Sequence, residues 1–157
     1  MSRICQLSGL EKARAEELID LVSQQTDLVP EPGSDLEKLD FALASLAIET
    51  AVARHAGTME ETYTLMGKTY VQEGKNLTKV GQIVVTGGSL IHTKRTAEIA
   101  AHALYDSLKP QSLRPMKADV WVDRKYILAA MGLLASYHPK TALAIMKKEL
   151  EYYGHSE

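Results

Sequence analysis

The stretch Ile83-Val84-Val85-Thr86-Gly87-Gly88-Ser89-Leu90-Ile91 runs from β-favouring residues into a Gly-Gly turn and then into a segment with a helical pattern. A strand, a glycine turn and a helix in this order are typical of a ligand site, because glycine lets backbone N–H groups come close to a bound anion. A Gly-Gly pair after a buried strand is also a common structural turn. The stretch alone therefore leaves a binding turn and a purely structural turn open.

The composition is that of one ordinary globular domain. The 157 residues are enough for a single core, and the net charge is only −2. Without a basic stripe carrying aromatic residues, a nucleic-acid partner is not expected. Cys5 is the only cysteine, so the sequence predicts neither a disulfide framework nor a cysteine metal site, and it fits a reducing compartment.

The N-terminal region, 1–57, is predicted to be helical. Ser8 followed by Glu11 has the spacing of a capping box and predicts a helix to about residue 25. Ser34 and Glu37 form a second capping box before a longer, largely buried helix. We find no signal peptide and no membrane-length apolar span at this end, so we expect a cytoplasmic protein with no membrane partner.

After residue 57, the sequence is predicted to form strands as well as helices. A β-ribbon is predicted for 61–72, and the C-terminal region, 82–153, reads as a parallel right-handed βαβ unit with a further helix. We therefore expect an α/β fold in a single domain over 1–157. Within it, the predicted strands are 82–86, as the central buried strand, and 118–122; the predicted helices are 93–108, 126–137 and 139–153.

Few residues carry an independent chemical signal. No two of the five histidines have metal-ligand spacing within one element, and Ser89 lacks the surroundings of a nucleophile, so neither a metal site nor a catalytic residue is predicted. His92 is interpreted as a solvated loop histidine. Gly132, inside a helix, is interpreted as a point of close packing. Met131, Leu134 and Tyr137 are interpreted as core.

Two segments together resemble the C-terminal half of the actin-like ATPase superfamily. They are the strand ending in Thr86-Gly87-Gly88-Ser89 and the helix that follows Asp123. Over nearly the whole chain, and most specifically from residue 54, the sequence is similar to the MutL-type accessory proteins of coenzyme-B12-dependent glutamate mutase, which are distinct from the mismatch-repair proteins of that name. The segments that carry this resemblance are Arg54–Gly57, Tyr63–Lys68, Tyr70–Leu77, Val85–Gly88, Leu113–Pro115 and Asp123–Leu134.

The resemblance implies a fold, a ligand and a partner. The fold would be a ribonuclease-H-like α/β subdomain, the C-terminal part of a larger protein. The function would be ATP-linked protection or reactivation of an adenosylcobalamin-dependent glutamate mutase, whose subunits would be the partners. By position, Thr86, Gly87, Gly88 and Ser89 would lie along the nucleotide, and Gly132 would let the connecting helix approach the hinge between subdomains.

One motif of the superfamily is not found in this sequence. The superfamily holds metal and phosphates with an N-terminal Asp-x-Gly turn, which this sequence lacks. ATP or ADP with Mg would therefore be complete only in the full-length protein, and we expect no ATP hydrolysis by this chain alone. Two alternatives stay open: a mutase-binding module that uses the ribbon or the N-terminal helices, and an unrelated soluble α/β domain with a structural Gly-Gly turn.

Overall fold

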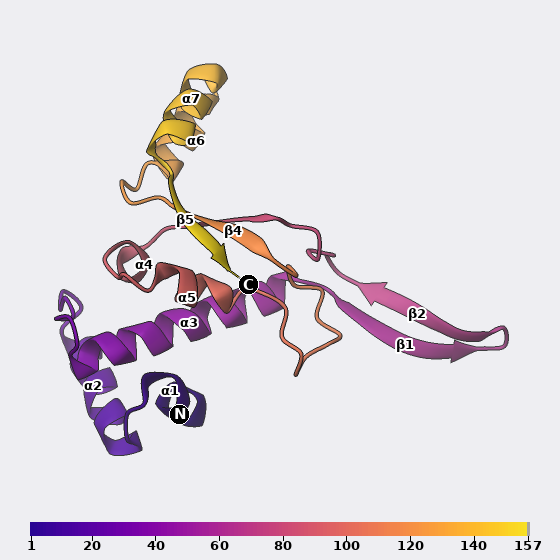
Figure 1. Cartoon of the computed structure of the whole chain (residues 1–157), viewed down its shortest axis with the longest axis horizontal. Helices are drawn as coiled ribbons and strands as arrows, with labels where there is room; N and C mark the ends of the chain where they lie inside the picture. The colour runs from indigo at the N-terminus through magenta and orange to yellow at the C-terminus, as the bar shows by residue number, and fades with distance from the viewer. Residues whose placement is uncertain (157) are drawn as a thin grey trace.

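The computed structural model describes residues 1–156 and shows a layered α/β body with two projections. A three-stranded sheet lies over the short helices α4 and α5, the long helix α3 lies beneath these, and α1 and α2 form the outermost layer (Figure 1). The helices are α1 Ser2–Ser8, α2 Lys12–Gln24, α3 Asp35–His55, α4 Gly88–Ile91, α5 Thr96–Ala101, α6 Leu128–Ala135 and α7 Pro139–Glu149; the strands are β1 Thr58–Thr64, β2 Gly67–Glu73, β3 Gln82–Val85, β4 Ala118–Val122 and β5 Glu151–Ser156.

The sheet has the order β3-β4-β5. Strands β3 and β4 are parallel, with Val85 opposite Val122 at their carboxyl ends, which confirms the predicted parallel pair. The prediction that 82–86 is the central strand is wrong, because β5 pairs antiparallel with the other side of β4 and leaves β3 at an edge. The mixed α/β class is confirmed.

The core lies on one face of this sheet. Val85, Val120 and Val122 point to the same side and pack with Ile91 and Ala100 of the helices beneath. Alternation along the strands places Val84, Trp121 and Tyr152 on the other face. Val84 is 45% exposed and Tyr152 is 50% exposed, so this outer face is only partly covered.

The start of α3 follows the predicted capping box. The Ser34 hydroxyl accepts a hydrogen bond from the Glu37 N–H at 3.2 Å, and the Glu37 carboxylate accepts one from the Gly33 N–H at 2.6 Å. The other predicted box is wrong. Ser8 ends α1 instead of starting a helix, because Gly9 adopts a left-handed backbone that terminates α1. The next helix begins four residues after Ser8, at Lys12.

The predicted ribbon is present as a long antiparallel hairpin of β1 and β2, which projects from the body (Figure 1). Thr58 pairs with Glu73 at its base and Thr64 with Gly67 at its tip, so it extends beyond the predicted 61–72. Five of its apolar side chains are more than half exposed: Tyr63, Leu65, Met66, Tyr70 and Val71. The hairpin therefore offers a surface that its own chain does not cover.

The predicted helix over 93–108 is too long. The chain forms α4 directly after the glycine turn, and the Thr96 hydroxyl donates to the Leu90 carbonyl at 2.7 Å, which stabilises a break between α4 and α5. The predicted helix over 139–153 is also too long, since α7 ends at Glu149 and Glu151–Ser156 pairs with β4. Helix α7 does begin at Pro139, as expected.

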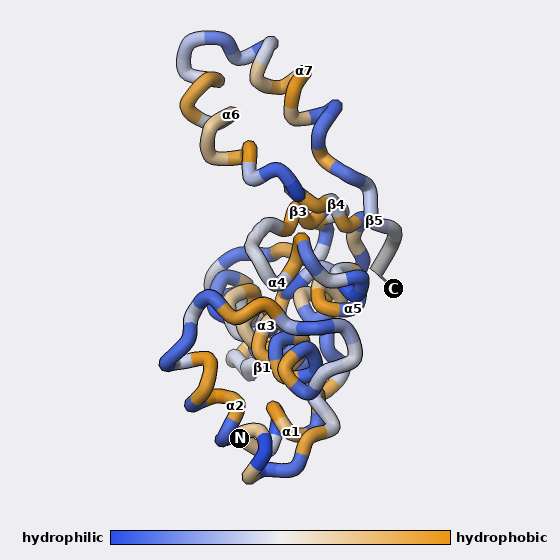
Figure 2. The backbone as a smooth tube through the Cα atoms, turned by 90° about the vertical axis from the view of Figure 1, so that its left-hand side faces the viewer, coloured by the Kyte–Doolittle hydropathy of each residue, from blue (hydrophilic) through white to orange (hydrophobic). Residues whose placement is uncertain are grey.

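Helices α6 and α7 pack against each other and project from the sheet (Figure 2). The prediction of Asp123 as the N-cap is wrong, because that position is occupied by Ile127 and α6 begins only at Leu128. The Asp123 carboxylate still accepts hydrogen bonds from the backbone N–H groups of Ile127 and Leu128, both at 3.0 Å. No residue of α6 is buried, and Tyr137, which follows it, is 83% exposed, so the interpretation of Tyr137 as core is wrong. Met131 and Leu134 are half-buried.

Across residues 1–156, no helix has both the length and the apolar character needed to cross a membrane.

Candidate functional site

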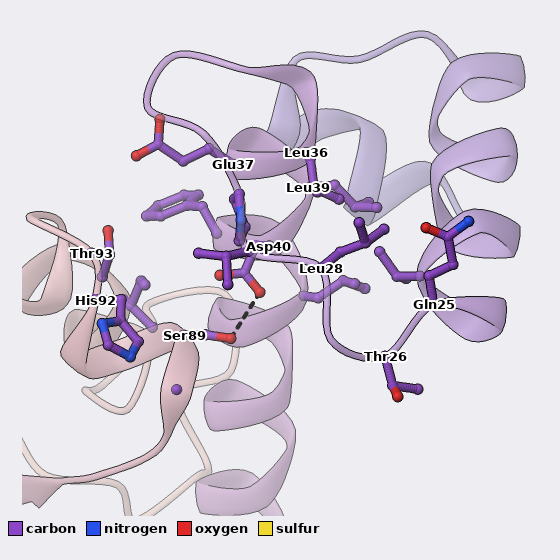
Figure 3. Close-up of a pocket in the computed structure, with 17 residues that line it drawn as sticks. Gln25, Thr26, Leu28, Leu36, Glu37, Leu39, Asp40, Ser89, His92 and Thr93 are labelled. Carbon is purple, nitrogen blue, oxygen red and sulfur yellow. Dashed lines mark hydrogen bonds between the residues drawn. The ribbon is translucent and has the colours of Figure 1, made fainter.

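A pocket of about 570 Å³ lies between α3, the loop that precedes it and the segment around α4 (Figure 3). Gly88 and Ser89, from the glycine turn, form part of its wall. The remaining lining residues are Val22, Gln25, Thr26, Leu28, Val29, Pro30, Leu36, Glu37, Leu39, Asp40, Phe41, Leu43, His92, Thr93 and Ile99. The glycine turn that follows β3 therefore contributes to a cavity of the size that small-molecule sites usually have.

One hydrogen bond joins the two sides of this pocket. The Ser89 hydroxyl donates to the Asp40 carboxylate at 2.8 Å, across 49 residues of sequence, as Figure 3 shows. Asp40 lies in the second turn of α3, whose N-terminus is fixed by the Ser34 cap, so a firmly positioned helix presents the carboxylate. Ser89 and Asp40 thus form a pair of polar groups in the pocket. The Ser89 hydroxyl can donate or accept a hydrogen bond, and the Asp40 carboxylate can accept hydrogen bonds.

The pocket combines a leucine-rich wall with acidic groups. Leu28, Leu36 and Leu39 lie on one side in Figure 3, and Glu37, His92 and Thr93 lie toward the other. The lining includes two carboxylates, Glu37 and Asp40, and no lysine or arginine. Such a lining suits a neutral ligand with a flat apolar part and hydroxyl groups, and it disfavours phosphate.

The Arg95 side chain lies just outside the pocket lining and packs against one of its residues, Phe41. The Arg95 guanidinium carbon is 3.4 Å from the centre of the Phe41 ring, and the same guanidinium pairs with Glu98 at 2.8 Å. Phe41 is buried and lines the pocket. Arg95 therefore fixes the ring of a pocket residue, and its own charge is neutralised by Glu98.

The predicted site residues separate into three places. Gly88 and Ser89 line the pocket. Thr86 and Gly87 precede them at the carboxyl end of β3, outside the lining. Gly132 lies on the projecting helix α6, and a Cβ built there meets no atom within 4 Å among the described residues. The described part of the chain therefore shows no close packing at Gly132.

Sequence reasoning missed Asp40 and Glu37 as residues of the pocket lining. Glu37 is predicted only as part of a capping box, and Asp40 carries no sequence signal, because only the tertiary fold brings Asp40 to Ser89. His92, interpreted as a solvated loop residue, is exposed and also lines the pocket. Tyr126 is the one non-glycine residue in the described chain with positive φ, at 53°. No sequence signal reports such a conformation.

Within residues 1–156, no group of three or more His, Cys, Asp or Glu side chains is placed to hold a metal ion.

Comparison with known proteins identifies the family of this chain. Residues 2–150 match the family described as MutL protein. The chain belongs to the MutL protein family. A curated relative, Protein MutL from Clostridium tetanomorphum, is 40% identical over 128 residues, which make up 82% of this chain and 28% of the relative.

The chain thus spans under a third of the length of that relative. No solved structure matches it. The family match identifies the chain as more than an unrelated α/β domain, and it leaves the role of the pocket to be argued from its geometry.

Proposed function

We propose that this chain is the C-terminal nucleotide-binding subdomain of an accessory protein, and that the pocket at Gly88 and Ser89 takes the nucleoside part of ATP or ADP. The observation that carries the proposal is the 2.8 Å hydrogen bond from Ser89 to Asp40 inside this pocket. The family resemblance implies that the glycine turn lies along a nucleotide, and the cavity lies at that turn.

The lining fits one part of a nucleotide. Its apolar wall, with Leu28, Leu36 and Leu39, suits a flat base, and the carboxylate of Asp40 is a good acceptor for ribose hydroxyl groups. Its volume of about 570 Å³ accommodates a nucleoside. The lining does not fit phosphate or Mg, since it has two carboxylates and no cation, so those groups would need residues from elsewhere in a full-length family member.

Family membership supports the wider role. We propose that full-length members are ATP-dependent chaperones that protect or reactivate an adenosylcobalamin-dependent glutamate mutase in the cytoplasm, with the actin-like, ribonuclease-H-like fold that the motifs resemble. The parallel β3–β4 pair, with the glycine turn at its carboxyl end, is compatible with that fold. Because the pocket lacks phosphate-binding groups, this chain alone is expected not to hydrolyse ATP.

Calorimetric titration with adenosine and ADP tests the pocket. The chain and the longer Clostridium relative should both bind, and Asp40→Asn or Ser89→Ala should weaken adenosine binding about tenfold, the equivalent of about 1.4 kcal/mol. Asp20→Asn, which changes an exposed carboxyl group on α2, is the matched control and should bind normally. If folded wild-type chain and the longer relative both fail to bind millimolar adenosine and ADP, the proposal is wrong.

The hairpin favours a second candidate function, a mutase-binding module. Leu65 and Met66 at its tip are fully exposed, and Tyr63 is 74% exposed. Exposed apolar side chains of this kind mark contact surfaces for other proteins. In this candidate the hairpin would contact the glutamate mutase subunits and the pocket would be structural.

Pull-down of purified glutamate mutase subunits distinguishes the two candidates. A Leu65→Ser, Met66→Ser double variant should lose the mutase, whereas Val84→Ser, an exposed change on the sheet, should retain it. Retention of the mutase by the tip variant would exclude the hairpin tip as the contact.

A further inference from the structure

Helix α6 is an apolar helix without a buried face. Its sequence, Leu128–Ala135, contains no polar side chain, and none of its residues is buried. It packs chiefly against α7, and Leu133 on its surface is 76% exposed. A Cβ built on Gly132 meets no described atom within 4 Å. Because a helix that is apolar on all sides is normally covered, the projecting position leaves α6 without its partner surface.

The outer face of the sheet is a second apolar surface without a cover. Helices α4 and α5 cover the inner face, whereas Val84 is 45% exposed and Tyr152 is 50% exposed on the outer one. Trp121 lies between these two residues, on the middle strand. Figures 1 and 2 show α6 and α7 on the side of the sheet away from α4 and α5. The uncovered helix and the uncovered sheet face therefore lie on the same side of the molecule.

The connections between the sheet and the helix pair are suited to a swinging motion. Residues 123–127 join β4 to α6, and Leu150 alone joins α7 to β5. Tyr126, in the first connection, has a φ of 53°, which a bulky side chain rarely adopts, and its 53% exposure shows that burial does not hold it there. The Asp123 carboxylate, by accepting two backbone N–H groups at 3.0 Å, keeps the start of α6 at the end of β4. Rotation at the two connections therefore moves the far end of the pair and keeps its attachment to the strands.

The helix pair matches the sheet in size and is tied together at its base. Lys125 pairs with Glu149, and Arg124 pairs with Glu151, so the two connections move as one body. The eight residues of α6 span about 12 Å, and the five residues of β4 span about 17 Å. Three strands measure about 10 Å across, which is also about the distance between the axes of two packed helices.

We propose that α6 and α7 close onto the outer face of the sheet of their own chain, where α6 packs against Val84, Trp121 and Tyr152. Closure removes two apolar surfaces from water at once, and the hydrophobic effect favours it in proportion to the apolar area removed. It also gives the sheet helices on both faces, as sheets with parallel strands usually have. The projecting arrangement is then the open form of the helix pair.

Pulsed electron paramagnetic resonance on the full chain tests this closure by measuring the distance between two nitroxide labels. The labels are attached at Lys79→Cys, before β3, and at Ser136→Cys, at the far end of α6, in a Cys5→Ser background. Lys79 and Ser136 are both exposed. Closure should shorten the separation of the labels by at least about 10 Å relative to the projecting arrangement, because α6, about 12 Å long, swings from beyond the strand ends to lie along them.

Charged variants of the two apolar surfaces identify the contact. Leu133→Glu and Val84→Glu should each restore the long separation, since each places a carboxylate in the closed contact. Both residues are exposed in the open form, so both variants should fold, which circular dichroism checks. Leu65→Glu is the matched control: it makes the same change as Leu133→Glu at a fully exposed leucine of the hairpin, and it should keep the short separation.

Three results would overturn the proposal. The first is a long separation in the labelled protein without further changes. The second is a short separation that persists in both Leu133→Glu and Val84→Glu, because the two surfaces would then not be in contact. The third is a short separation that disappears when labelled protein is mixed with an excess of unlabelled protein, because the labels would then lie on two copies of the chain.

Discussion

Gly57 lies so close to Glu73 that a Cβ atom on Gly57 would come within 2.1 Å of the Glu73 carbonyl oxygen. The same Cβ would meet the backbone of Gly74 and Lys75 at 2.6 and 2.8 Å. Gly57 follows the last turn of α3 and precedes β1, and its N–H donates to the Lys75 carbonyl at 2.7 Å. The long helix and the base of the hairpin therefore meet at a position where only glycine fits.

A Gly57→Ala variant should be strongly destabilised, because all three close atoms belong to backbone and cannot rotate away. We expect a loss of about 3 kcal/mol in the free energy of unfolding, at the upper end of overpacking effects. Urea denaturation measures it. Gly81→Ala is the control, since a Cβ there meets no described atom within 4 Å. Equal stability of the two variants would contradict the close approach.

The two glycines of the turn should respond differently to alanine. Gly87 has φ 116° and ψ 152°, a region almost restricted to glycine, so Gly87→Ala should cost about 1–3 kcal/mol. Gly88 starts α4, and a Cβ there is at an ordinary contact distance from the Tyr126 hydroxyl, so Gly88→Ala should be tolerated. Thermal unfolding of the pair checks this. A Gly88→Ala variant less stable than Gly87→Ala would refute the assignment.

Removing the Asp123 carboxyl group should loosen the projecting helices. Asp123 is 1% exposed and accepts two hydrogen bonds at the start of the α6 segment. Asp123→Ala should lose about 1–2 kcal/mol, because two backbone N–H groups would lose their acceptor. Asp123→Asn, which keeps one carbonyl oxygen, should lose less. Circular dichroism and thermal unfolding measure both effects, and equal melting temperatures of all three proteins would argue against a stabilising role of the Asp123 carboxylate.

Stability should fall in mildly acidic solution because of His102. Burial lowers the pKa of His102 below its usual 6.5, and the charge of Glu49 opposes this only in part. The unfolded state then binds the proton more readily than the folded state as the pH falls through 6.5, so the free energy of unfolding decreases from there toward the lower folded pKa. Denaturant titrations at pH 7.5 and 5.5 should show this decrease.

The matched variants for this pH effect are His102→Gln and His55→Gln. His102→Gln should show a smaller decrease in stability between the two pH values. His55 is exposed at the end of α3, and its variant should behave as the wild type. A His102→Gln protein with an unchanged pH dependence would show that another group is responsible.

Local sequence signals predicted the elements that depend on neighbouring residues. Ser34 and Glu37 predicted the start of α3, and the β-forming residues around Tyr63 and Tyr70 predicted the hairpin. The wrong predictions fall where contacts beyond the local sequence pattern determine the secondary structure. Glu151–Ser156 is a strand because β4 is available to pair with it, and Ser8 ends a helix because Gly9 turns left-handed.

The candidate site was predicted only in its glycine turn. Gly88 and Ser89 were identified from a strand–turn pattern, which is local. Asp40 could not be, because nothing in helix periodicity says which of its polar residues faces a loop 49 positions away.

Trp121, the only tryptophan in the chain, lies in the middle strand of the sheet. Its ring centre is 5.2 Å from that of Tyr152 on β5, and it faces the outer side that the chain leaves partly open. Tryptophan fluorescence therefore reports on the environment of the sheet alone. The molecule carries an intrinsic optical reporter, whose emission would show the separation of β4 from β5, or the covering of that face, without any attached dye.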